Sequence, residues 1–306
     1  MTVPARLGSS WRDVHEIGSV LGMRLLAGTC RLLGRRAVRF LLHPIVLYYF
    51  LAKRVPRRAS REYLQRAAGV SRVAWIQVYR HLFCFAECTL DRYLFVVGRT
   101  HALEVSVRGH HHLVRAVQKG RGALLLGAHL GSFEAMRAAS AISHLRISVV
   151  ADFRGSRMIS GMLERLNPAL SDEVIPVGDG FETVLRIKER IDAGELVALL
   201  ADRVSPKERA VTASFWGAPA RFPVGPYLLA ATLACPVLLT FGIRKTPNRY
   251  EVHCEPFANQ ITLPRRHRDP ALPSLVQRYA ARLEHYCRMA PDNWFNFFDY
   301  WSPSVD

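Results

Sequence analysis

The feature that most limits the possible folds is a change of pattern near residue 103. From there on, short apolar runs of β type alternate with segments whose apolar residues recur at helical spacing. The runs are LEVSV (103–107), GALLLG (122–127), ISVVAD (147–152), EVIPV (173–177), ELVALLAD (195–202), PVLLTFGI (236–243) and YEVHCEPF (250–257). This alternation predicts an α/β fold in which a mixed central sheet is flanked by helices.

The segments between these runs have the spacing of covering helices. They are HHLVRAVQKG (111–120), SFEAMRAASAIS (132–143), SRMISGMLERLN (156–167), FETVLRIKERIDAG (181–194) and GPYLLAATLA (225–234), and a last helix is expected near 271–289. Segment 205–225 is punctuated by Gly and Pro, which favours a hairpin or a lid.

The first hundred residues differ from the rest of the chain in their apolar pattern and in their charge. Residues 60–100 keep apolar residues at helical spacing, so we expect a helical region over 1–100 and an α/β domain over 101–306. The net charge is +17, and residues 1–119 contain 20 Lys and Arg against 6 Asp and Glu. Such a block attracts nucleic acid, anionic lipid headgroups or an acidic protein, and the sign of the charge does not choose among them.

The N-terminal helical region is expected to associate with a membrane. In residues 17–52 single arginines interrupt the apolar clusters, and the longest uncharged run, 40–52, is shorter than the roughly 20 residues that a spanning helix needs. Arginines next to Leu, Phe and Tyr suit a helix that lies in the interface. A buried helical hairpin with a basic solvent face is the alternative. Residues 1–15 lack the apolar core of a secretory signal, which favours the cytoplasmic side.

Cysteine and histidine spacing indicates neither disulfides nor a metal site. The cysteines at 30, 84, 88, 235, 254 and 287 form no CxxC pair, so we interpret them as reduced and mostly buried thiols. The consecutive histidines 110–112 splay to different faces and have no carboxylate or cysteine at ligand spacing. We therefore expect no metal and no bound cofactor.

Two ionisable residues stand on a glycine-flanked turn, LGAHLGSFEAMR (126–137), between apolar stretches. His129 follows a run of buried-strand type, Ser132 is placed to cap the next helix, and Glu134 falls in its first turn. A carboxylate next to an imidazole fixes one tautomer and stabilises the protonated form, as a general base requires. We expect His129 to be that base and Glu134 to orient it. A capped helix with a structural loop histidine is the alternative.

Four segments in a fixed order resemble a known family. HLGSFE is followed by LLADR (199–203), FWGAPARFPVGPYLLA (215–230) and RMAPDNWFNF (288–297). This order is similar to that of the lipid A late acyltransferases, the lauroyl- and myristoyl-transferring branch of the lysophospholipid acyltransferase superfamily, and the resemblance covers residues 11–301. It implies a glycerolipid-acyltransferase-like fold. It also implies that His129 deprotonates an acceptor hydroxyl, which attacks an acyl thioester, with Glu134 supporting the histidine.

The same resemblance implies the partners and the location. The donor would be acyl carrier protein or coenzyme A carrying a fatty acyl chain, and the acceptor a hydroxyl or amine of a lipid or glycolipid on the cytoplasmic face of the bacterial inner membrane. The basic surface suits both an acidic carrier protein and an anionic membrane surface. Asp202-Arg203 stands where the family has Asp-Gln, so the acceptor stays open; glycolipid, ornithine-lipid and aryl-polyene pathways are the alternatives.

Further substrate-binding positions are expected around the histidine. Arg154 and Arg203 follow predicted strands and could bind phosphate or stabilise an oxyanion, unless they form ion pairs with Asp152 or Asp202. The other positions are Gly131, Ser132, Phe215, Gly217, Phe222, Pro223 and Gly225. The residues of 215–225 match a family element that lines the acyl or acceptor path, and they suit a packed hairpin equally well.

The alternative from another functional class is a non-catalytic basic protein that binds lipid or nucleic acid. The sequence contains no RNP-like aromatic pattern, helix-turn-helix pattern or zinc knuckle, and its charge lies among apolar residues. We therefore expect an enzyme with no nucleic-acid partner.

Overall fold

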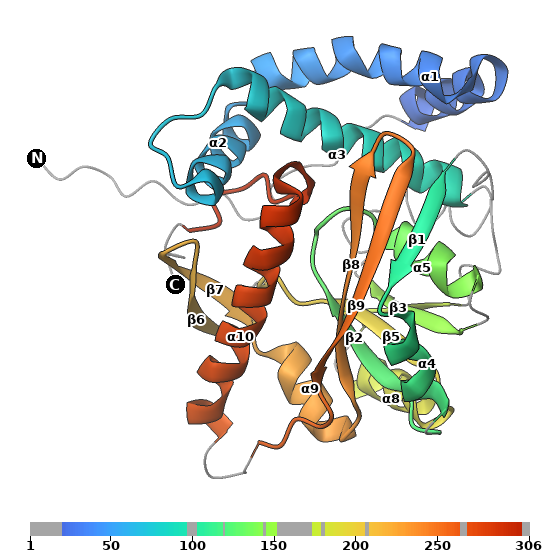
Figure 1. Ribbon diagram of the computed structural model, residues 1–306, viewed down its shortest axis with the longest axis vertical. Coiled ribbons are helices and arrows are strands. Elements are labelled where there is room, and N and C mark those ends of the chain that lie inside the picture. Colours follow the sequence, from blue (N-terminus) through green and yellow to red (C-terminus); the bar gives the residue numbers. More distant parts are fainter. Residues whose placement is uncertain are drawn as a thin grey trace, which may run out of the picture.

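A seven-stranded mixed sheet forms the centre of the protein, with helices on both faces and three N-terminal helices across one end (Figure 1). The computed structural model describes residues 20–96, 103–118, 120–142, 145–151, 173–178, 181–205, 208–263 and 268–301.

The strands of this sheet come from the seven predicted runs. They are β1 (Glu104–Arg108), β2 (Ala123–Gly127), β3 (Ile147–Ala151), β4 (Val174–Pro176), β5 (Leu196–Leu200), β8 (Val237–Thr246) and β9 (Arg249–Ala258), in the order β1-β9-β8-β2-β5-β3-β4. Strands β8, β2, β5, β3 and β4 run parallel to one another, and β1 is parallel to β9. The pair β8 and β9 is antiparallel, which makes the sheet mixed. The predicted mixed sheet is confirmed.

The helices divide between two apolar cores, one on each face of the sheet. They are α1 (Val20–Ala52), α2 (Arg54–Ala68), α3 (Trp75–Val96), α4 (His110–Gln118), α5 (Phe133–Ile142), α8 (Phe181–Asp192), α9 (Gly225–Leu233) and α10 (Arg268–Met289). Helices α1, α4 and α5 contribute to one core, α2, α8, α9 and α10 contribute to the other, and α3 contributes to both. Strand β2 serves both, because Leu124 and Leu126 face one core and Ala123 and Leu125 the other.

The remaining local predictions can be compared directly. Segment 205–225 contains an antiparallel hairpin, β6 (Ala210–Phe215) and β7 (Ala218–Pro223), which packs against α10. The five cysteines whose side chains are described are free and buried, as expected. The helix predicted over 156–167 lies outside the described residues.

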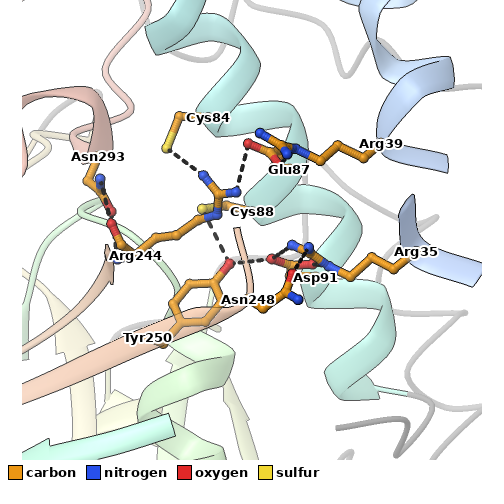
Figure 2. A network of polar contacts seen from close by, with 10 residues as sticks. All are labelled: Arg35, Arg39, Cys84, Glu87, Cys88, Asp91, Arg244, Asn248, Tyr250 and Asn293. Atoms are coloured by element: carbon orange, nitrogen blue, oxygen red, sulfur yellow. Dashed lines mark hydrogen bonds and ion pairs between the residues drawn. The ribbon is translucent and has the colours of Figure 1, made fainter. Parts of the chain in front are cut away.

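Helix α1 is attached to the body of the protein by charge (Figure 2). Arg35 forms two hydrogen bonds of 2.7 Å with Asp91 on α3, and Arg39 pairs with Glu87 one turn earlier at 2.6 Å. Both carboxylates are buried, and each has a second partner on the sheet: Arg244 lies 2.7 Å from Glu87, and the hydroxyl of Tyr250 donates to Asp91. These contacts hold α1 and α3 against β8 and β9.

The structure also bears on the N-terminal region. In the described part of the chain, no helix combines the length and the apolar character that crossing a membrane requires. Helix α1 is broken at Gly34, which has non-helical dihedral angles, and it contains Pro44. Association of residues 1–100 with a membrane stays a prediction.

Candidate active site

The site forms where two neighbouring parallel strands end. Strands β2 and β5 pair in register, with Gly127 opposite Leu200. His129 and Asp202 each come two residues after these partners, so the two side chains leave the same edge of the sheet side by side. Ligand sites in open α/β sheets are found at this edge.

The turn that carries His129 is fixed by close backbone contacts. Gly131 has a φ of +71°, and a Cβ at this position would lie 1.9 Å from the carbonyl oxygen of Gly242 on β8, so no larger residue fits. Ser132 caps α5: its hydroxyl accepts a hydrogen bond of 3.1 Å from the backbone N–H of Ala135, as the sequence predicts. Gly131 and Ser132 therefore shape the turn.

His129 is paired with Asp202. Its Nδ1 lies 2.8 Å from one carboxylate oxygen, and its backbone N–H donates to the other at 3.1 Å. Because a carboxylate only accepts, Nδ1 carries the hydrogen and Nε2 the lone pair. The His129 side chain is 29% exposed, whereas that of Asp202 is 0% exposed. Among the described residues Nε2 has no hydrogen-bond partner, so the basic nitrogen faces outward from a buried carboxylate.

The C-terminal segment 293–300 supplies the other partners of Asp202. Trp294 Nε1 and Asn296 Nδ2 each donate to Asp202 Oδ2 at 3.1 Å, and the Tyr300 hydroxyl donates to its backbone carbonyl at 2.8 Å. The same segment holds the histidine turn, because the N–H of Phe295 donates to the carbonyl of His129 at 2.8 Å. Both halves of the pair are thus fixed from one segment.

The protonation states of the pair follow from burial and charge. Burial acts to raise the pKa of Asp202, but the charge and hydrogen bonds of His129, together with the charge of Arg203, hold that pKa well below its usual range. The pKa of His129 is lowered by burial and by the charge of Arg203, against the opposing effect of Asp202. At neutral pH the site therefore contains a carboxylate next to a neutral imidazole, the form in which a base accepts a proton.

Glu134 occupies a different position from the expected one. Its carboxylate pairs with Arg92 of α3 at 2.6 Å, and its second oxygen lies 3.4 Å from the Ser132 hydroxyl. The prediction that Glu134 contacts His129 is therefore wrong. The carboxylate that contacts the imidazole is that of Asp202. Glu134 lies in the first turn of α5, where its carboxylate faces Arg92 of α3.

Arg203 lies next to the pair, as its place after a strand predicts. Its Nε donates to Asn296 Oδ1 at 2.7 Å, and Nη2 donates to the backbone carbonyl of Phe295 at 2.6 Å. Burial lowers the pKa of Arg203 to about 10, so the guanidinium stays charged at neutral pH. Arg154 and Asp152 lie outside the described residues.

The hairpin residues pack behind the site. Phe215 and Phe222 are fully buried, and the Phe215 ring lies 5.2 Å from that of Trp294, measured between centroids. Pro223 ends β7 and is also buried, Gly225 begins α9, and Gly217 forms the hairpin turn with a φ of +72°. Of these positions, Phe215 contacts Trp294, which in turn donates to Asp202.

Sequence reasoning missed Asp202 as the partner of His129, and also Trp294 and Asn296 as its supports. A signal was present: Asp202 follows a buried strand, as His129 does, and parallel neighbours bring such positions together. No local pattern identifies the partners in 293–297, which lie more than 90 residues away in the chain.

The sequence was compared with curated proteins and with models of protein families. No curated protein matches the chain significantly. A family model described as bacterial lipid A biosynthesis acyltransferase matches residues 21–302. The match includes the histidine turn, Asp202 and the C-terminal segment, so this protein is an acyltransferase and belongs to the bacterial lipid A biosynthesis acyltransferase family.

Proposed function

We propose that this acyltransferase moves a fatty acyl chain from a thioester of acyl carrier protein, or of coenzyme A, to a hydroxyl or amine of a lipid or glycolipid acceptor. The observation that carries the proposal is the pair of His129 and Asp202, a partly exposed imidazole on a buried carboxylate. Family membership supports an acceptor in lipid A synthesis. An acceptor of ornithine-lipid or aryl-polyene type is the alternative, since Arg203 replaces the family's Gln.

The proposed reaction uses His129 first as a base and then as an acid. Nε2 takes the proton from the acceptor hydroxyl while the oxygen attacks the thioester carbonyl, and Asp202 stabilises the imidazolium that forms. The tetrahedral intermediate then collapses by breaking the carbon–sulfur bond. The imidazolium returns its proton to the departing thiolate, so the products are the acylated acceptor and a free thiol.

Arg203 is proposed to act through its charge. Its Nε and Nη2 already donate to the C-terminal segment, so the guanidinium is fixed in place next to the imidazole. A fixed positive charge lowers the energy of the oxyanion that develops on the thioester carbonyl, because it needs no rearrangement during the reaction.

Replacement of the base tests this function. We expect purified H129A to lose about 10²- to 10⁴-fold of its acyl transfer rate from acyl carrier protein to an inner-membrane lipid extract, since that is the usual contribution of a general base. H285A, which removes an exposed histidine on α10, serves as the matched control and should keep the wild-type rate. Mass spectrometry of the lipids identifies the acceptor. A wild-type rate in H129A would contradict the proposal.

We also propose that the protein docks on the anionic, cytoplasmic face of the inner membrane through α1 and the start of α3. Twelve of the fifteen exposed large apolar side chains found in the described residues lie between positions 32 and 85, and they include Phe40, Tyr48 and Trp75. Arginines are interspersed with them, and 14 of the 17 net positive charges fall within residues 1–119. A surface that is both apolar and basic suits the headgroup region of a bilayer better than water.

Vesicle binding tests the docking surface. The double variant F40S/Y48S of the full-length protein should bind phosphatidylglycerol vesicles at least about tenfold more weakly, because two apolar anchors are lost. F181S is the matched control: Phe181 is 80% exposed but lies on α8, away from this surface. Equal losses in both variants would argue against a specific docking face.

A further inference from the structure

A second charged pair lies beside the histidine turn, and the proposed reaction gives it no part. Arg92 Nε on α3 lies 2.6 Å from Glu134 Oε1 on α5. The Glu134 side chain is 17% exposed and that of Arg92 is 42% exposed, so the carboxylate lies on the protein side of the pair and the guanidinium on the solvent side. The Ser132 hydroxyl, 3.4 Å from the second oxygen of Glu134, ties the carboxylate to the same turn that carries His129.

The exposed guanidinium keeps donors available. Arginine has five N–H donors in a planar fork, and the contact with Glu134 is made through Nε. Within the described ranges no hydrogen bond is formed by Nη1 or Nη2 of Arg92. The Glu134 carboxylate therefore holds the Nε side of the guanidinium, while the Nη1 and Nη2 donors stay open. Such an arrangement allows an arginine to bind an anion.

The charge of Arg92 also reaches the proposed base. The charged groups that act on the His129 imidazole are Asp202, which is negative, and Arg203 and Arg92, which are positive. The pKa of His129 is lowered first by burial and then by Arg203, and the charge of Arg92 lowers it further. Arg92, although paired with Glu134, therefore lies close enough to the imidazole for its charge to lower the His129 pKa.

We infer that Arg92, held in place by Glu134, binds a phosphate-type anionic group of a substrate next to the position where acyl transfer occurs. This inference rests on the proposed function, since it places the bound group beside His129. Glu134 is then a positioning residue for Arg92 and not for the histidine. The anionic group has two possible sources: a phosphate on the lipid acceptor, or the phosphodiester of the phosphopantetheine arm that carries the acyl chain.

A binding measurement that needs no turnover tests the inference. In the full-length protein with ¹³C-labelled histidine, NMR titration reports the pKa of His129. Inorganic phosphate should raise it relative to chloride at equal ionic strength, because a bound anion offsets the charge of Arg92. In R92Q this rise should be absent, and in E134Q it should be reduced. R72Q, which removes an exposed arginine before α3, should behave as wild type.

The outcomes of this titration separate the two proposals. No rise with phosphate, or the same rise in R92Q as in the wild type, would overturn the role of Arg92 without affecting the role of His129. Conversely, a wild-type transfer rate in H129A would overturn the proposed function even where Arg92 binds phosphate.

Kinetics then identify the source of the anion. With acyl-4′-phosphopantetheine as donor, R92Q should lose about 10- to 100-fold in kcat/KM, the usual value of a charged hydrogen bond, and R92K should recover part of it. If the loss disappears with acyl-pantetheine, which lacks the phosphate, the donor supplies the anion. An equal loss with both donors assigns the anion to the acceptor, and no loss with either contradicts the inference.

Discussion

Two polar regions at the same end of the sheet pair their buried carboxylates with different kinds of cationic side chain. On α3, Glu87 and Asp91 are buried and paired with arginines, which carry a permanent charge (Figure 2). At the histidine turn, Asp202 is equally buried but is paired with His129, an imidazole that can take up and release a proton. The first arrangement fixes helices to strands, and the second can take part in proton transfer.

A comparison of two histidines makes the same point. His81 on α3 is fully buried, and both ring nitrogens have partners: Ser60 Oγ at 2.8 Å and the carbonyl of Trp294 at 2.8 Å. His129 is partly exposed, and among the described residues a side chain occupies only its Nδ1. A structural histidine uses both nitrogens internally, whereas a proposed base keeps one for the substrate. The four predictions below test this distinction, beginning with the largest effect.

The first prediction concerns the carboxylate of the site. D202N should lower kcat for acyl transfer by about 10⁴-fold, since an amide no longer fixes the Nδ1–H tautomer or stabilises the imidazolium. Steady-state kinetics measure the loss, and thermal unfolding checks that the fold is kept. If D202N retains most of its activity while E134Q does not, Glu134 is the partner that matters, contrary to the geometry.

The second prediction concerns the carboxylate of the α3 region. D91N should lower the free energy of unfolding by about 3–5 kcal/mol, because it leaves Arg35 without its buried counter-charge. Denaturant titration measures the change. The kcat of the folded fraction should stay near the wild-type value, and a loss of kcat comparable to that of D202N would show that the two regions are not functionally distinct.

The third prediction uses the pH dependence of stability. Burial lowers the pKa of His81 to about 4, while an unfolded chain has its histidines near 6.5. Between pH 6.5 and pH 4 the unfolded state therefore binds a proton at His81 that the folded state does not bind. The contribution of His81 to the free energy of unfolding is complete above pH 6.5 and is lost as the pH falls toward 4. The loss should be about 3 kcal/mol.

Urea unfolding at several pH values checks this expectation. The stability difference between wild type and H81Q should narrow from pH 7 to pH 4, since the variant has no such group to titrate. Parallel pH profiles for the two proteins would contradict the assignment of a neutral, structural His81.

The fourth and smallest prediction concerns the proton affinity of the base. The charge of Arg203 helps to lower the pKa of His129, so R203Q should raise that pKa. The reaction needs the neutral imidazole, so kcat/KM falls at pH values below the His129 pKa. A raised pKa should therefore move this acidic limb of the pH profile to higher pH. R203K keeps the charge and should keep the limb in place. A pH–rate profile between about pH 5 and 8, which brackets the ordinary histidine pKa, distinguishes the two.

Most of the fold could be predicted from the sequence because strands buried on both faces are apolar throughout. Strand β2 is ALLLG with every residue buried, and β5 is LVALL. Such runs leave few alternatives once helical segments separate them. The same reasoning could not predict how α1 attaches, because the pairing of Arg35 and Arg39 with Asp91 and Glu87 depends on contacts across about 50 residues of chain.

The candidate site was predicted in part. His129 stands out because an ionisable residue follows a buried strand, and Arg203 stands out for the same reason. Glu134 is predicted as the partner from its place in the next helical turn and from the family resemblance, but closeness in sequence does not measure distance across a turn. The residue that contacts the imidazole is 73 positions away, and the register of β2 and β5 brings it there.

The C-terminal segment has a consequence for how the protein loses activity. Trp294, Asn296 and Tyr300 complete the surroundings of Asp202, yet they lie more than 90 residues beyond it in the sequence. Proteins open locally before they unfold as a whole, and an opening that detaches this segment removes three of the groups that hold Asp202. We therefore expect mild denaturant to inactivate the enzyme before the central sheet unfolds.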